Sequence, residues 1–108
     1  MMRSTLEEVS AYMRDELDAP VYAAVPASRP PYFVVIDPIG GSAEGEAVHP
    51  EYAVQAWGRK DADAEGLLRD ACDAMRDYGA EIEALPVRMG RDATHVMWRA
   101  SFVVHSLY

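Results

Sequence analysis

The sequence predicts a single α+β domain, in which two helices pack on a mostly antiparallel or mixed sheet of about four to five strands. Residues 51–57 alternate between two faces as a strand does, and residues 61–78 place apolar side chains at helical spacing. A second alternating stretch closes the chain at residues 95–107. The length of 108 residues suits one hydrophobic core and leaves no room for a separate catalytic domain.

The run from Glu51 to Gly79 organises this prediction, because it joins a strand to a helix through a short turn. Tyr52, Val54 and Ala56 share one face of the strand. Beyond the strand, apolar residues recur at steps of three and four, at Ala64, Leu67 or Leu68, Ala71, Met75 and Tyr78. A helix must bury such a stripe, so we expect it to fold back across the sheet.

Several residues mark the ends and the middle of this helix. Asp61 is predicted as the N-cap, and Asp63 and Glu65 follow in the first turn, where the helix dipole favours negative charge. Gly79 is placed to end the helix in the left-handed conformation. Gly66 lies inside the helix, where glycine costs about 1 kcal/mol relative to alanine. We therefore expect Gly66 to pack closely on the sheet or on a neighbouring subunit.

The chain begins with another predicted helix. Ser4 and Glu7 have the spacing of a capping box, in which each side chain satisfies a backbone donor at the helix start. Pro20 stops the helix. Its apolar stripe, which we expect to lie on the core, consists of Leu6, Val9, Met13 and Leu17.

Two strands follow this helix in the prediction. Residues 21–25 form a short strand, and the proline-rich PASRPP run is an extended connection. Residues 32–37, YFVVID, are continuously apolar and β-branched, which predicts a strand covered on both faces.

The stretch from Ile39 to Pro50 contains three glycines and no periodicity, so it is interpreted as a mobile loop or as the tip of a long hairpin. Its Gly-Gly pair lacks the Gly-Lys-Ser/Thr sequence of a phosphate-binding loop. The stretch is predicted to order against a partner, with plain disorder as the alternative. Together with Gly66, its residues make up the candidate subunit or partner interface: Ile39, Gly40, Gly41, Val48 and His49.

The last third of the chain is predicted to supply two more strands. Leu85, Val87 and Met89 alternate around Pro86, which limits that segment to an edge strand. The closing strand has an apolar face that we expect to form core, namely Val96, Trp98, Ala100, Phe102 and Val104. Its other face is polar, with His95, Arg99, Ser101 and His105.

Composition and motifs argue against catalysis, metal binding and nucleic-acid binding. Lys and Arg number 10 against 18 Asp and Glu, and a net charge of −8 disfavours a grip on phosphates. Cys72 is the single cysteine and is expected to be an inert buried residue. Asp61 and Asp63 point to different sides of a helix, and His49 is expected to be solvated, so neither predicts a metal site. We expect no catalytic residue, no metal and no cofactor.

The beginning of the chain carries acids and lacks the apolar run of a signal peptide, and no later segment has the length of a membrane span. The sequence therefore predicts a soluble protein made in the cytoplasm and not bound to a membrane.

Three stretches resemble the tail-terminator, or tail-completion, proteins of long-tailed phages and prophages. The first is PPYFVVIDPIGG, where the chain leaves a proline-rich spacer for a strand and a glycine loop. The second is VHPEYAVQAWGRKDADAEGLLRDACDAM, where a strand ending in Trp57-Gly58 precedes a helix with an acidic start. The closing HVMWRASFVVHSLY fits the last strand of that family.

The resemblance implies a structural protein of the virion, made in the cytoplasm of a bacterial host. Such proteins assemble as a ring, typically a hexamer, at the head-proximal end of the tail tube. The partners implied are other copies of the chain, the tail-tube protein and the head-connector or neck protein. The family supplies no catalytic residues and no cofactor, and DNA passes through the ring without specific binding.

Other functions remain open at this point. A head-closure, neck or tube protein of the same particle would share the small α+β ring-forming domain. A small ligand-binding or enzymatic domain would need a polar pocket, for which the sequence offers the scattered His49, His95 and His105. A cytoplasmic regulatory or antitoxin-like dimer would use the same apolar helix against one partner.

Overall fold

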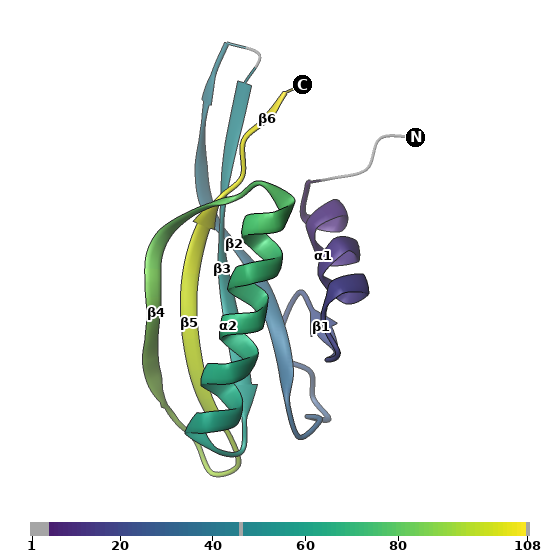
Figure 1. The fold of residues 1–108 in the computed structure, drawn as a ribbon, viewed down its shortest axis with the longest axis vertical. Helices are drawn as coiled ribbons and strands as arrows, with labels where there is room; N and C mark the ends of the chain where they lie inside the picture. Colours follow the sequence, from purple (N-terminus) through teal and green to yellow (C-terminus); the bar gives the residue numbers. More distant parts are fainter. Residues whose placement is uncertain (1–4, 46, 108) are drawn as a thin grey trace.

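The computed structural model of the protein describes residues 5–45 and 47–107. It has the predicted α+β architecture, one domain of two helices and a mixed sheet (Figure 1). The elements in chain order are α1 (Thr5–Glu16), β1 (Val21–Tyr22), β2 (Phe33–Glu44), β3 (Ala47–Gly58), α2 (Asp61–Tyr78), β4 (Glu81–Arg91), β5 (Val96–Val103) and β6 (Ser106–Leu107).

The sheet has the order β1-β2-β3-β5-β4, and β6 pairs with β3 beside this path. The short β1 runs parallel to β2, whereas the other neighbouring strands are antiparallel. Both helices lie on the same face of the sheet (Figure 1). The structure therefore has one helical layer over one face, and β3 is the central strand.

The core lies between the helices and the sheet. From α2 it takes Leu68, Ala71 and Met75, as the helical spacing predicts, and from β5 it takes Phe102, which is fully buried. Alternate residues of β2 and β3 complete it: Val34, Ile36, Tyr52, Val54 and Ala56. The faces predicted for residues 52–56 and for the last strand are confirmed, except that Trp98 is only half-buried at the margin of the core.

The face of the sheet opposite the helices is also partly buried. Phe33 is fully buried there, and its ring stacks on that of Trp57 with the centroids 5.6 Å apart. The rings of Tyr22 and His95 meet its edges at 5.9 and 5.6 Å. Val35 on the same face is also buried. The prediction that residues 32–37 would be covered on both faces is therefore confirmed for residues 33–36, all of which are buried.

The polar face predicted for the last strand includes two buried residues, His95 and Ser101. The Nε2 of His95 lies 2.8 Å from the backbone oxygen of Pro30. A carbonyl oxygen only accepts, so Nε2 donates, and Nδ1 lies 2.8 Å from the Thr94 hydroxyl oxygen. His95 therefore fastens the proline-rich connection to the turn before β5.

The Asp92 carboxylate supports the same turn. It accepts hydrogen bonds from the backbone N–H groups of Thr94 and His95, at 2.9 and 2.8 Å, and pairs with Arg29. The bond from Arg29 and those two N–H groups hold the pKa of this carboxyl well below its ordinary value. The Arg29 guanidinium also lies over the ring of Trp57, 5.1 Å from its centroid.

The predicted capping of the helices is partly corrected. The N-cap of α2 is Lys60 and not Asp61, and no side chain bonds the free N–H groups there. The Asp61 carboxylate instead accepts from Trp98 Nε1 at 2.9 Å and from Arg88 Nε at 2.8 Å, which lowers its pKa. Gly79 ends the helix in the left-handed conformation as predicted, with φ of 103°. Ser4, the predicted cap of α1, lies outside the described residues.

The closing strand is interrupted, whereas the sequence predicted one run over residues 95–107. β5 ends at Val103, and the chain resumes strand pairing only in β6, against Ala47 and Val48. The register against β3 is the same on both sides of the break, since Glu51 pairs with Val103 and Val48 with Ser106. The N–H of Val104 still donates to the carbonyl oxygen of Pro50, but Pro50 has no N–H to give a bond in return.

Candidate functional site

The distal half of the β2–β3 hairpin, residues 39–50, projects beyond the end of α2, and we call it the hairpin arm (Figure 1). Its two strands pair in register, with Gly41 opposite Pro50 and Ala43 opposite Val48. The interpretation of these residues as a mobile loop is therefore wrong, and the alternative, the tip of a long hairpin, is correct. Glu46 lies outside the described residues.

The glycine pair has a structural reason in this arm. The register of β2 against β3 is irregular between Pro38 and Gly40, and Gly40 and Gly41 have φ of 154° and 148°. A Cβ atom on Gly41 would stand 2.9 Å from the backbone oxygen of His49 and from Cα of Pro50. No other residue type fits so close to the facing strand without a shift of backbone. The glycines that argued against a strand are what allow this one to bend and pair.

A hollow of about 720 Å³ lies between the arm and α1. Three of the predicted interface residues, Gly40, Gly41 and Val48, line it together with Leu6 of α1 and Tyr52 of β3. Burial raises the pKa of the Tyr52 phenol, so this side chain stays neutral at physiological pH. The described lining has no charged side chain. Such a surface suits packing against another polypeptide better than binding a charged substrate.

The remaining predicted residues of the arm have different surroundings. Ile39 is 40% exposed at the irregularity of β2. His49 is half-buried, and its Nδ1 lies 2.7 Å from Nδ1 of His105. The Nε2 of His105 lies 3.4 Å from a carboxylate oxygen of Glu81. His49 is therefore only partly solvated, because its ring is half-buried against His105.

The two histidines tie separate parts of the chain together. Their rings meet edge to face at 4.8 Å, so His49 of the arm contacts the segment that follows β5. In a hydrogen bond between two ring nitrogens one must donate and the other accept, which requires at least one neutral ring. Sequence reasoning missed this pair, and no local pattern contains it, because it depends on the register that sets residue 49 opposite residue 105 between the pairs Glu51–Val103 and Val48–Ser106.

This cluster does not amount to a metal centre. Among the described residues, no group of three or more His, Cys, Asp or Glu side chains is arranged to hold a metal ion. Cys72 is buried as predicted, and burial raises the pKa of its thiol, which disfavours the reactive thiolate.

Gly66 does not join the other predicted interface residues. A Cβ atom there would meet no other atom within 4 Å, so the expected close packing on the sheet is wrong. It borders a separate hollow, between Asp18, Tyr32 and Leu67. Contact with a neighbouring subunit remains the prediction for this position.

Within the described chain, neither helix combines the length and the apolar character needed to cross a membrane.

Comparison with models of protein families finds none that matches this chain. A comparison with curated proteins likewise finds no match.

Proposed function

We propose that this protein is a structural component of a phage or prophage particle, where a ring of its copies caps the head-proximal end of the tail tube. The ring terminates tail growth and forms the surface to which the head connector joins. The protein is made in the cytoplasm of the bacterial host and ends in the neck of the virion. It acts without catalysis, metal or cofactor. The hairpin arm is the observation that carries the proposal, alongside the resemblance of the sequence to tail terminators.

The arm has the features of a contact element. It extends past the helical layer (Figure 1). It is built of paired strands, and its inner side borders the hollow described above, whose described lining has no charged side chain. Gly40 and Gly41 have no side chain and Ser42 has a small one, so another backbone can approach this stretch closely. Burial of Ile39 and Val48 against a neighbouring subunit or the tube would add apolar contact area.

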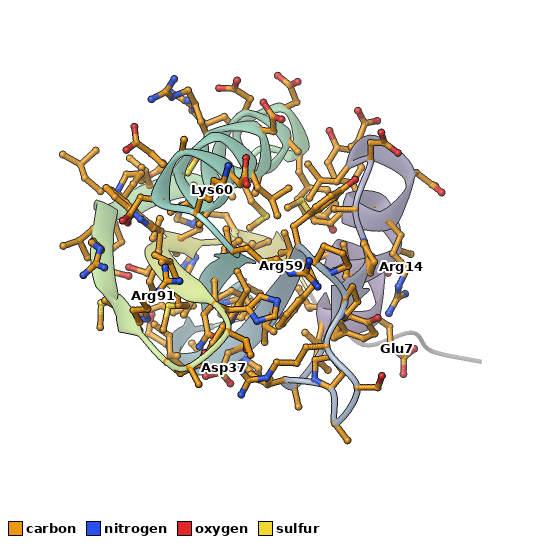
Figure 2. The ribbon with its side chains drawn as sticks, turned by 90° about the horizontal axis from the view of Figure 1, so that it is seen from below. Glu7, Arg14, Asp37, Arg59, Lys60 and Arg91 are labelled. Carbon is orange, nitrogen blue, oxygen red and sulfur yellow. The ribbon has the colours of Figure 1, made fainter. Side chains whose placement is uncertain are left out.

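The negative net charge of the chain is compatible with a ring through which DNA passes. A net charge of −8 per subunit is multiplied in a ring, and a negative bore repels DNA and prevents it from sticking as it passes. The end of the molecule away from the arm also carries basic side chains, among them Arg59, Lys60 and Arg91 (Figure 2). We infer that DNA passes the ring without specific binding.

The arm can be tested with a matched pair of single substitutions. Ile39 on the arm and Val25 in the connection before β2 are exposed to 40% and 38%, so a lysine at either position costs the monomer little. Ile39→Lys is expected to weaken ring formation and binding to purified tail tubes, whereas Val25→Lys leaves both unchanged. The readouts are mass by light scattering and co-sedimentation with tubes.

Equal assembly of the two variants would remove the arm from the proposal. Deletion of residues 40–47 provides the stronger version of the same test and should leave a folded monomer that assembles poorly. A ring that also binds tubes along their length would favour the tube-protein alternative. A ring that binds the head connector but not the tube would favour a neck protein.

A further inference from the structure

The two lateral edges of the subunit differ in character. The strand β4 forms one edge of the sheet and β1 the other, and α1 covers the β1 side (Figure 1). Four of the seven large apolar residues that are exposed in the described chain belong to β4, namely Ile82, Leu85, Val87 and Met89. An exposed apolar edge of this kind indicates contact with another chain.

A groove of about 430 Å³ lies between α2 and β4 along this edge. Its apolar lining consists of Cys72, Ile82, Leu85, Pro86 and Trp98. Leu85 is 74% exposed. Because Pro86 lacks a backbone N–H and the register of β4 against β5 is irregular, a further strand would not pair well with β4. A partner at this edge is therefore held mainly by side chains.

The helix α2 separates its charges between its two flanks. Both of its arginines, Arg69 and Arg76, line the groove on the β4 side. Four of its six acidic residues line the hollows on the α1 side instead, namely Asp63, Asp70, Asp73 and Asp77. The described lining of those hollows includes no basic side chain. One flank of each copy is therefore complementary in charge to the other flank of a second copy.

The arginines of α2 are not committed to partners within one copy. Arg69 pairs with Glu65 at 2.9 Å, and Arg76 pairs with Asp73 at 2.7 Å. All four side chains are exposed, and pairs of this kind contribute little to stability. Both arginines can therefore bond the acids of another copy.

The charges recur with the same spacing on both flanks. Arg69 and Arg76 are seven residues apart, or about 10.5 Å along the helix, and Asp70 and Asp77 have the same separation. A ring with a single rotation axis relates its copies without translation along that axis. If the axis runs along α2, residues at the same height meet. Arg69 is then level with Asp70 of the next copy, and Arg76 is level with its Asp77.

The exposed Leu85 stands at the height of a hollow on the α1 side. Arg88 is level with Asp61, which its Nε bonds at 2.8 Å. The pairing of β4 with β5 places Leu85 about 7 Å beyond Arg88, and Gly66 lies roughly 7.5 Å beyond Asp61 along α2. Gly66 and Leu67 line a hollow of about 460 Å³, and a Cβ atom on Gly66 would meet nothing within 4 Å. This hollow has room for the Leu85 side chain of the adjacent copy.

We propose that the groove between α2 and β4 of one copy packs against the α1 side of the next copy, on the flank of α2 that carries Asp70 and Asp77. The occupant is a second copy of this chain because its acidic flank matches the two arginines in charge and in spacing. The contact joins two different surfaces, so its repetition about one axis closes a ring and leaves every hairpin arm on the same rim. The inference rests on the ring proposed above and assigns the surfaces that hold its subunits together.

Charge reversal on each flank tests the contact. Arg69→Glu with Arg76→Glu reverses the groove flank. Asp70→Arg with Asp77→Arg reverses the acidic flank. Each double variant sets like charges against each other, so it should raise the concentration at which the ring forms, alone or on tail tubes, by about tenfold or more. The chain with all four substitutions restores opposite charges at each contact and should form the ring as wild type does.

Arg59→Glu with Lys60→Glu is the control. It matches the groove variant in net charge but lies at the end of the molecule away from the arm, so the ring should form normally (Figure 2). Light scattering over a concentration series gives the masses, and circular dichroism verifies that each variant is folded. A wild-type ring that both flank variants form equally well, or that the folded four-substitution chain fails to recover, would overturn the contact and leave the ring standing. A wild-type chain that forms no ring, alone or on tubes, would overturn the proposed function and the contact with it.

Discussion

The apolar face of β5 offers a quantitative test of the packing. Phe102 is fully buried against the helices, whereas Trp98 lies half-buried beside the groove and binds Asp61 through its indole N–H. Truncation of a fully buried aromatic side chain to alanine costs about 3–5 kcal/mol, because transfer energy is lost and a cavity is left. We expect that cost for Phe102→Ala.

Trp98→Ala is expected to cost about half as much, roughly 2 kcal/mol, because the exposed part of the ring loses no burial and the open groove leaves no closed cavity. Phe102→Leu serves as a volume control and should cost about 1.5 kcal/mol or less. The measurement is urea unfolding followed by far-ultraviolet circular dichroism, with the slope compared among variants to confirm that each unfolds in the same way.

The order of the two alanine variants is the decisive result. A Trp98→Ala protein that loses as much stability as Phe102→Ala would show that Trp98 belongs to the core. A near-neutral Phe102→Ala would mean that the face of β5 assigned to the core is the wrong one.

Three other predictions follow from the described contacts. Gly41→Val should strain the arm by about 1–3 kcal/mol, because its Cβ would meet the backbone of His49, and a wild-type thermal midpoint would refute this. The pKa of Asp92 is lowered by Arg29, so its contribution to stability is present above about pH 4 and lost as the pH falls through the folded-state value. Asp92→Asn should therefore reduce stability at pH 7 and flatten its loss toward pH 2 in unfolding titrations, and an unchanged acid profile would count against the contact. Cys72→Ser should lower stability in urea without affecting assembly mass, whereas lost assembly at full stability would contradict an inert buried thiol.

Much of the fold follows from periodicity. The alternation of Tyr52, Val54 and Ala56 identifies the face of β3 that packs on α2, and Gly79 ends that helix as expected. Pro86 correctly predicts that β4 lies at an edge. These signals are local, because strand and helix spacing depends on which side of an element faces the core.

The arm was only half predicted, for a physical reason. Gly40 and Gly41 weaken the strand pattern, yet the close approach of the strand across from them requires glycine at position 41. Local propensity therefore disfavoured a strand that cross-strand pairing stabilises.

Contacts between distant segments lie beyond such patterns. The pairing of His49 with His105, and the burial of His95 against Pro30, depend on sheet register and on the path of connections. Neither leaves a periodic trace in the sequence. The same holds for Asp61, whose expected role as a cap was displaced by Trp98 and Arg88 from strands far along the chain.

The central claim is the ring, and its most direct measurement is the mass of the purified protein by light scattering over a concentration series, with negative-stain images of the large species. The proposal predicts a closed ring of about six subunits with a central hole, formed alone or on addition of tail tubes. A monomer or a simple dimer that stays so in the presence of tubes would contradict it.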